Sequence, residues 1–205
     1  NSDYVDKAIR NAELIFIAGG DQATYVNAWQ GTRVEDALHF AHARGAVIGG
    51  TSAGLAVMGE FVYDPDGIAG ITSAEALANP YNPFMMLTAD FLRFPIMDNI
   101  ITDSHFHARD RMGRTLAFMA RLRQDGRASQ ITALAIDEQT SLFIDRNGVG
   151  IVDNNGSGAS LDKKGMAVAY RHGIGEQNEF LASLYHLDNN NGINYGLPWL
   201  RKKGA

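Results

Sequence analysis

The chain has 205 residues, a hydrophobic content of 45%, no cysteine and a formal net charge of -5. Its length and ordinary composition predict one globular domain, spanning residues 1–205, with a sizeable buried core. The acidic balance argues against a nucleic-acid partner, and no apolar run approaches the roughly 20 residues of a membrane span. The lack of cysteine excludes disulfides and thiol chemistry but leaves the compartment open, with a cytoplasmic location favoured and secretion as the alternative.

The first half of the chain alternates short apolar runs with stretches of helical spacing. The run at 14–18 ends at a glycine pair and is typical of a buried parallel strand, and Thr32 with Glu35 matches a capping box at a helix start. Such alternation predicts a doubly wound, mostly parallel, flavodoxin-like α/β sheet with helices on both faces. The expected elements are a strand at 14–18, helices at 23–29 and 34–41, a strand at 46–48 and a helix at 55–58.

The second half begins with a stretch rich in Gly, Pro, Asp and Asn, over 63–83, which predicts a loop long enough to carry function. Asn147-Gly148 supplies a turn between two short strands, so a β-hairpin is expected beside the sheet. The polar tail around 189–192 predicts little regular structure. The remaining expected elements are the end of a strand at 100–102, a helix at 111–122, and strands at 131–136, 141–144, 149–152 and 166–170.

The segment Gly50-Thr51-Ser52-Ala53-Gly54 matches the pattern Gly-x-Ser-x-Gly. It follows a predicted strand and precedes a helical pattern, which is the context that a nucleophile elbow requires. The sharp turn would lift the hydroxyl of Ser52 above the end of the sheet, and the flanking glycines would let strand and helix approach without Cβ clashes. We therefore predict that Ser52 is a nucleophile; an ordinary glycine-rich loop is the alternative.

A serine hydroxyl needs a base to accept its proton, and His105 is the preferred candidate among the six histidines. It comes directly after the strand ending at Thr102, and ligands of open α/β sheets gather at the carboxyl ends of strands. His107 is the main competitor. Asp103, His105 and His107 could alternatively share one side and hold a metal ion.

The base needs an orienting acid, and the tetrahedral intermediate needs hydrogen-bond donors for its oxyanion. Glu138, just past another strand end, is the preferred acid, with Asp137 and Asp103 as alternatives. The N–H of Ala53 is one natural oxyanion donor, and the turn at Gly20 could bring the second. That turn lacks the spacing of a dinucleotide or phosphate-binding loop.

Three arginines, Arg109, Arg111 and Arg114, follow His105 closely. Guanidinium groups bind carboxylates in a bidentate manner, so a carboxylate of the substrate is a reasonable target. Pairing with Asp110, or simple solvation on a helix, is the alternative for each.

Taken together, these segments resemble the serine peptidase family that contains cyanophycinase and the aspartyl dipeptidase called peptidase E. The third matching stretch, rich in arginine, resembles cyanophycinase more than peptidase E. The resemblance covers roughly residues 10 to 170. The matching stretches are Gly19-Gly20-Asp21-Gln22, Gly50 to Gly54, Asp103 to Arg114, and Ala135-Ile136-Asp137-Glu138.

This resemblance implies a doubly wound α/β fold, a triad of Ser52, His105 and Glu138, and no cofactor or metal. It also implies hydrolysis of cyanophycin, a poly-aspartate with arginine on each β-carboxyl, to β-Asp-Arg dipeptides by a homodimeric exopeptidase. An Asp-X or isoaspartyl dipeptidase, and a binding homologue without catalysis, are the alternatives. The positions that match the family's substrate pocket are Gln22, Ser73, Asp103, Arg109, Arg111 and Arg114.

Two departures from the family pattern bear on this interpretation. Ser104 stands where the family usually has glutamine before the histidine, which would alter a contact in the pocket. The strand and helix that open the family's fold are absent from this chain. That section lies on a separate fragment, is omitted from the sequence, or is replaced by another closure of the sheet. An exposed sheet edge would invite dimerisation.

Overall fold

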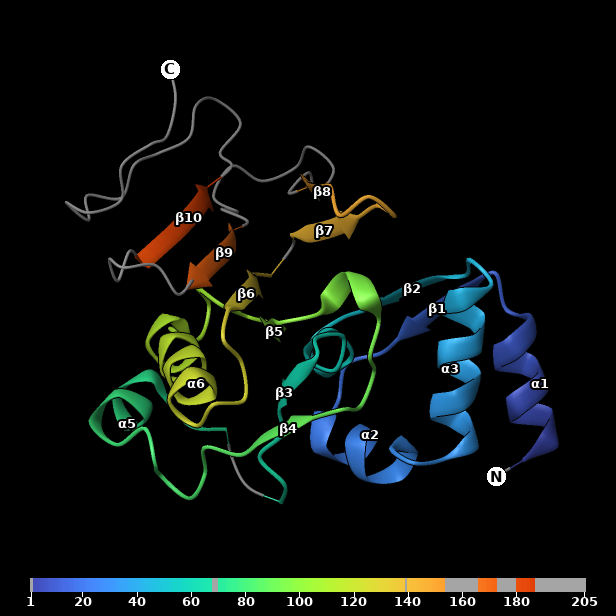
Figure 1. Cartoon of the computed structure of the whole chain (residues 1–205), viewed down its shortest axis with the longest axis horizontal. Helices are drawn as coiled ribbons and strands as arrows, with labels where there is room; N and C mark the ends of the chain where they lie inside the picture. The colour runs from blue at the N-terminus through green and yellow to red at the C-terminus, as the bar shows by residue number, and fades with distance from the viewer. Residues whose placement is uncertain (1, 68–69, 139, 154–165, 173–179, 187–205) are drawn as a thin grey trace.

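The computed structural model describes residues 2–67, 70–138, 140–153, 166–172 and 180–186. Its main layer is a six-stranded sheet in the order β10-β9-β6-β5-β3-β4 (Figure 1). The central strands β3, β5 and β6 run parallel. β4 and β9 pair antiparallel with β3 and β6, and β10 pairs antiparallel with β9. The six strands are β3 (Phe61–Tyr63), β4 (Leu87–Ala89), β5 (Ile100–Asp103), β6 (Ile131–Ile136), β9 (Met166–His172) and β10 (Phe180–His186).

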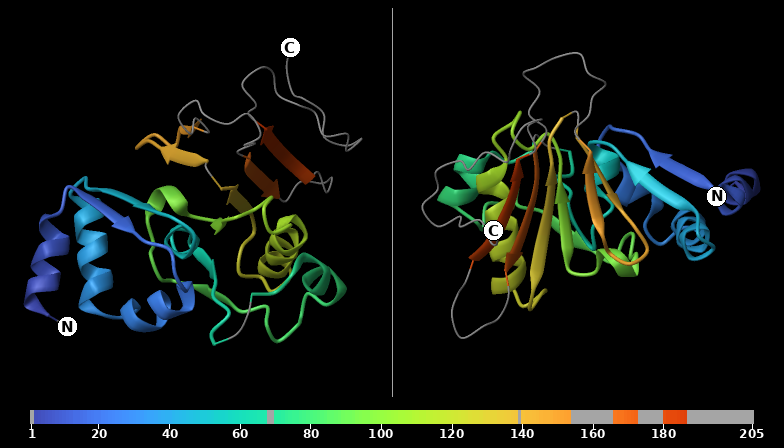
Figure 2. Two further views of the ribbon diagram at one scale, coloured as in Figure 1. Left: turned by 180° about the vertical axis from the view of Figure 1, so that it is seen from behind. Right: turned by 90° about the horizontal axis from the view of Figure 1, so that it is seen from above.

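A second, smaller layer lies beside this sheet (Figure 2). It consists of a parallel strand pair whose register runs from Leu14 opposite Val47 to Ile17 opposite Gly50. An antiparallel hairpin, β7 (Ser141–Ile144) with β8 (Gly150–Asp153), lies between β6 and β9 in the chain. The smaller layer contains α1 (Asp3–Asn11), β1 (Leu14–Ile17), α2 (Gln22–Trp29), α3 (Arg33–Ala43) and β2 (Val47–Gly50).

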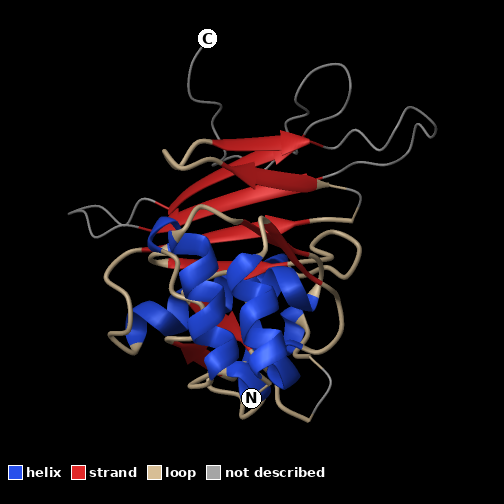
Figure 3. Ribbon diagram, turned by 90° about the vertical axis from the view of Figure 1, so that its right-hand side faces the viewer, coloured by secondary structure: helices blue, strands red, loops and turns tan. Residues whose placement is uncertain are grey.

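Residues of β3 alternate between two hydrophobic clusters because successive side chains of a strand point to opposite faces. Phe61 and Tyr63 pack with Phe118 of α6 (Met112–Gln124), next to α5 (Ser73–Ala78). Val62 packs in the other cluster, with Val26 of α2 and Leu38 of α3. Helices therefore cover both faces at this strand, and Figure 3 shows them gathered against the stack of strands.

The predicted α/β class, with parallel central strands and an added hairpin, is confirmed. The predicted loop at 63–83 contains α5, which the sequence analysis missed although Thr72 and Glu75 form a complete capping box there. The helix after the glycine-rich turn, α4 (Ala53–Ala56), is shorter than expected. The elements α1, β3, β4, β10 and the 3₁₀ turn Pro95–Met97 were not anticipated, and the tail at 189–192 lies outside the described residues.

Two expectations in the smaller layer were wrong in detail. The strand β1 is not buried on both faces, since Leu14 is 66% exposed and Phe16 63% exposed. Within the described ranges, helices cover only the face of β1 opposite to these two side chains. At α3, Thr32 caps the helix as predicted, but the carboxylate of Glu35 accepts the N–H of Gly31 instead of closing the capping box. No helix in the described part of the chain is long and apolar enough to cross a membrane.

Among the glycines in the described part of the chain, Gly54 in α4 has the least room for a side chain. A Cβ placed there would lie 2.0 Å from the carbonyl oxygen of Ile17, at the end of β1. Real Cβ atoms do not approach backbone atoms this closely, and the backbone on both sides would have to move. The junction of β1, β2 and α4 therefore requires glycine at this position.

We expect Gly54→Ala to lower the free energy of unfolding by about 2–3 kcal/mol or more, since the added methyl overpacks backbone against backbone. Gly49→Ala in neighbouring β2 is the matched control: its Cβ would meet only the ring of Phe16, at 3.8 Å, and should cost less than about 1 kcal/mol. Urea unfolding of both variants measures the difference. Equal stability of the two variants would contradict this view of the junction.

Candidate active site

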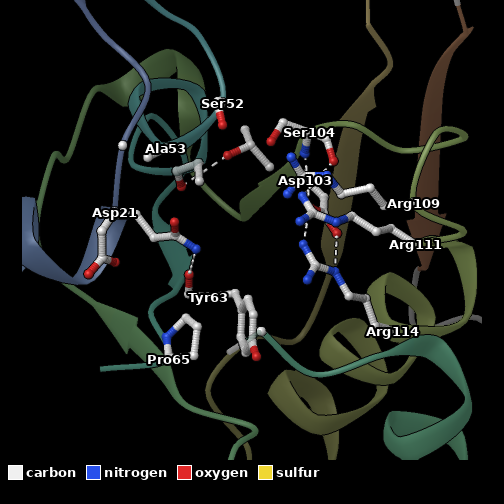
Figure 4. Close-up of a pocket in the computed structure, with 15 residues that line it drawn as sticks. Asp21, Ser52, Ala53, Tyr63, Pro65, Asp103, Ser104, Arg109, Arg111 and Arg114 are labelled. Atoms are coloured by element: carbon white, nitrogen blue, oxygen red, sulfur yellow. Dashed lines mark hydrogen bonds and ion pairs between the residues drawn. The ribbon is translucent and has the colours of Figure 1, made fainter. Parts of the chain in front are cut away.

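Ser52 occupies a tight turn between β2 and α4. Its backbone has φ 52° and ψ -115°, a strained conformation for a non-glycine residue that surrounding contacts must enforce. Gly50 is pressed against the same turn, since a Cβ there would lie 2.3 Å from the carbonyl oxygen of Gly54. The turn raises the side chain of Ser52 beyond the carboxyl end of β2, into the pocket shown in Figure 4.

His105 reaches Ser52 from the end of β5. Its Nε2 lies 2.9 Å from the Oγ of Ser52, and its Nδ1 lies 2.8 Å from a carboxylate oxygen of Glu138, just beyond β6. With its proton on Nδ1, the imidazole donates to the carboxylate and accepts from the serine hydroxyl. The structure thus brings together the three side chains that the sequence analysis selected, from three different strand ends.

The competing acids, Asp137 and Asp103, have partners other than His105. The carboxylate of Asp137 accepts the backbone N–H groups of His107 and Ala108, at 3.1 and 3.2 Å. The carboxylate of Asp103 is bound by arginines. Within the described ranges, no group of three or more His, Asp or Glu could hold a metal ion, so the alternative metal site at Asp103 and the two histidines does not form.

The predicted oxyanion donors, Gly20 and Ala53, both line the pocket next to Ser52. The glycine turn lies against the serine, because a Cβ at Gly19 would be 3.2 Å from the Cβ of Ser52. The hydroxyl of Tyr25, which the sequence analysis did not select, contacts the carbonyl oxygens at 18 and 19 at 3.1 Å each. Because Tyr25 lies in α2, these contacts tie the glycine turn to that helix.

Thr102 is a second residue that the sequence analysis missed. Its buried hydroxyl in β5 lies 2.8 Å from the carbonyl oxygen of Leu55 and 3.1 Å from that of Ala56, at the end of α4. The hydroxyl therefore ties the helix that follows Ser52 to the strand that precedes His105. A hydroxyl within a strongly apolar strand was the available signal, because buried polar groups need partners.

The pocket beside Ser52 has a volume of about 230 Å³. On one side, the amide of Gln22 donates to the carbonyl oxygen of Tyr63 at 2.9 Å and joins the start of α2 to the end of β3. On the other side, the three predicted arginines extend from the segment after β5 (Figure 4). The residues that line the pocket are Gly20, Asp21, Gln22, Ser52, Ala53, Ala56, Tyr63, Pro65, Gly70, Thr102, Asp103, Ser104, Arg109, Arg111 and Arg114.

Arg114 and Asp103 form a buried, bidentate ion pair at the back of this pocket, with each side chain only 5% exposed. The hydroxyl of Thr115 donates to the same carboxylate at 2.9 Å. The guanidinium of Arg114 also lies over the rings of Tyr63 and Phe118, at 5.1 and 5.6 Å from their centroids. Both residues line the pocket as predicted, but their charged groups pair with each other.

The positive charge of Arg111 is less completely paired than that of Arg114. Its Nη1 donates to the carbonyl oxygen of Ser104 at 2.7 Å and reaches Asp103 only at 3.4 Å. Burial, followed by the neighbouring charge of Arg114, lowers the pKa of Arg111 to about 10. The guanidinium of Arg109 lies on the same side of the cavity (Figure 4). The lining therefore holds three guanidinium groups against the carboxylates of Asp21 and Asp103, and this excess of positive charge favours an anionic ligand.

Ser73 does not line the pocket, unlike the other residues predicted to do so. Its hydroxyl bonds to the carbonyl oxygen of Asp110 and accepts the N–H of Arg114 at 3.1 Å. Because the N-cap position of α6, Arg111, makes no side-chain cap, Ser73 satisfies a donor at the start of this helix. In the structure, its contacts hold α5 against α6.

The chain belongs to peptidase family S51, whose model matches residues 1–152. It is 30% identical over 173 residues to a cyanophycinase of Geminocystis herdmanii, covering 83% of this chain and 55% of that protein. It is 29% identical over 163 residues to a cyanophycinase of a Nostoc species, covering 78% of this chain and 49% of the relative. The chain thus spans about half the length of the curated relatives it matches.

The fold is similar to that of a solved peptidase from an acI-B1 actinobacterium. The TM-score is 0.50 and the sequence identity 15%, with 95% of this chain and 64% of the solved chain covered. At this identity the likeness supports the α/β fold alone.

We expect Asp103→Asn to lower the free energy of unfolding by about 3 kcal/mol, because it leaves the buried guanidinium of Arg114 without a counter-charge. The control is Asp90→Asn, which breaks an exposed ion pair with Arg93. The side chain of Arg93 is 58% exposed and that of Asp90 is 70% exposed. That loss should stay below about 1 kcal/mol. Chemical denaturation compares them, and a loss at Asp103 no larger than at Asp90 would contradict a stabilising role for the buried pair.

Proposed function

We propose that this chain is a serine peptidase that hydrolyses cyanophycin to β-Asp-Arg dipeptides. The observation that carries the proposal is the row of hydrogen-bonded side chains from Ser52 through His105 to Glu138, with separations of 2.9 and 2.8 Å. Nucleophile, base and orienting acid in this order define the arrangement of serine hydrolases. Membership of peptidase family S51 and the matched cyanophycinases support the peptidase class and the substrate.

In the proposed mechanism, the Oγ of Ser52 attacks the scissile carbonyl carbon while its proton passes to Nε2 of His105. The carboxylate of Glu138 stabilises the resulting imidazolium. The N–H groups of Gly20 and Ala53 donate to the oxyanion. His105 then protonates the leaving amine as the C–N bond breaks, and a water molecule, deprotonated by the same imidazole, hydrolyses the acyl-enzyme.

The arginines supply the recognition of substrate carboxylates. Because the β-carboxyls of cyanophycin carry arginine, its free carboxylates are those of the attached arginyl groups and of the chain end. Arg111 is partly buried and incompletely paired, and Arg109 extends into the same cavity. A substrate carboxylate placed between Arg109 and Arg111 would neutralise positive charge that Asp103 does not pair. Arg114 would support these contacts from behind, because its own guanidinium is occupied by Asp103.

The size of the pocket suits a short unit rather than a long segment of chain. Its volume of about 230 Å³ lies below the range of roughly 300–1,000 Å³ that is usual for drug-sized ligands. This favours cleavage near a chain end. It also keeps an aspartyl or isoaspartyl dipeptidase as a second candidate function, with the same three side chains acting on a smaller substrate.

We expect Ser52→Ala to lower kcat for cyanophycin by about 10³-fold or more, because the nucleophile is lost. Chromatographic detection of released β-Asp-Arg measures this, and a fluorophosphonate should label the wild type but not the variant. Ser129→Ala, at an exposed serine outside the pocket, should behave as the wild type.

Turnover of Asp-X or isoaspartyl dipeptides without turnover of cyanophycin would select the dipeptidase. A wild type that is neither labelled nor active on any of these substrates would identify a non-catalytic homologue.

We expect Arg109→Ala to raise KM for cyanophycin about 10–100-fold, since a charge-assisted contact to a carboxylate of the substrate is lost. The rate of labelling by a small fluorophosphonate, which carries no carboxylate, should remain close to that of the wild type. Arg146→Ala removes an equivalent charge from an exposed turn and should leave KM unchanged. An unchanged KM in Arg109→Ala would remove this residue from substrate recognition.

A further inference from the structure

We propose that Asp137 is a positioning residue that holds His105 in line with Ser52, an inference that rests on the function proposed above. Asp137 directly precedes Glu138 at the end of β6, and its carboxylate bonds to the backbone that follows His105.

The contact is a clamp between two segments that are far apart in sequence. One carboxylate oxygen of Asp137 accepts the N–H groups of His107 and Ala108, which follow the base by two and three residues. Asp137 is only 9% exposed, so water competes weakly for these donors. Glu138 bonds to the ring of His105 itself. Two consecutive carboxylates therefore fix the same loop, one through its backbone and one through its imidazole.

The loop needs such a clamp because it is strained. His105 has φ 47°, a left-handed conformation that a histidine adopts only where its surroundings impose it. Within the loop, Arg109 and Arg111 donate their N–H groups to the carbonyl oxygens of His105 and Phe106. The N–H groups at 107 and 108 donate to Asp137 instead. The carboxylate thus completes the hydrogen bonding of the turn that begins at the catalytic base.

The role assigned to Asp137 is acceptance of two backbone hydrogen bonds, which an amide oxygen can also perform. Asp137→Asn keeps an acceptor at this position and removes only the charge. Asp137→Ala removes the acceptor and leaves two N–H donors without it. The pair of variants therefore separates alignment of the loop from the electrostatic effect of a carboxylate close to the imidazole.

The test measures the rate at which a small fluorophosphonate phosphonylates Ser52, with fluoride as the leaving group. This reaction needs Ser52 and His105 but no carboxylate contact to Arg109 on the same loop. Asp137→Ala should react 10–100-fold more slowly than the wild type, and Asp137→Asn within about threefold of it. Asp64→Ala removes a carboxylate of similar burial, 8% exposed, at the end of β3, and should react at the wild-type rate. Urea unfolding of each variant verifies that the folded state is the one assayed.

A second readout does not depend on turnover. In proton NMR, the Nδ1–H of His105 bonded to Glu138 should give a downfield resonance in the wild type and in Asp137→Asn, and should be lost or broadened in Asp137→Ala. Phosphonylation of Asp137→Ala at the wild-type rate, or of Asp137→Asn at a rate as low as that of the alanine variant, would overturn the inference. So would an unchanged Nδ1–H resonance in Asp137→Ala. An inert wild type that still shows this resonance would overturn the proposed function instead.

Discussion

Three backbone segments meet directly behind Ser52, and their approach sets where every other part of the site must lie. The carbonyl oxygen of Ile17 at the end of β1 occupies the space that a side chain at Gly54 would need, and Gly50 is pressed against the same turn. Because β1 and α4 touch at this point, the glycine turn after β1 lies beside the serine. One steric constraint thus places both the nucleophile and the proposed oxyanion donors.

The site is held in strained conformations by contacts that come from neighbouring elements. Ser52 and His105 both have positive φ, which neither residue adopts without support. Thr102 ties α4 to β5, and Asp137 ties the end of β6 to the segment after β5. Each support joins two elements that carry different proposed triad members. Stability of the fold and alignment of the three side chains therefore depend on the same hydrogen bonds.

Much of the fold and candidate site could be predicted because the signals were local. The Gly-x-Ser-x-Gly segment specifies a strand, a turn and a helix, and polar residues after apolar runs mark strand ends. Glu138 was preferred to Asp137, but the alternative stayed open, because adjacent residues share the same strand end and only the fold decides where each side chain points. The exposure of Phe16 was missed for a similar reason: an apolar run predicts a strand, but not which of its faces is covered.

The arginines illustrate how burial divides residues that look equivalent in sequence. The single negative charge of Asp103 can neutralise one guanidinium, and both of its carboxylate oxygens bond to Arg114. Arg111, at 3.4 Å from the same carboxylate, stays charged in a partly desolvated place, as its lowered pKa indicates. A neutral peptide in the pocket would desolvate this group further without pairing it, whereas a carboxylate would relieve the cost. Selectivity for acidic substrates would then come as much from the penalty on the wrong ligand as from attraction to the right one.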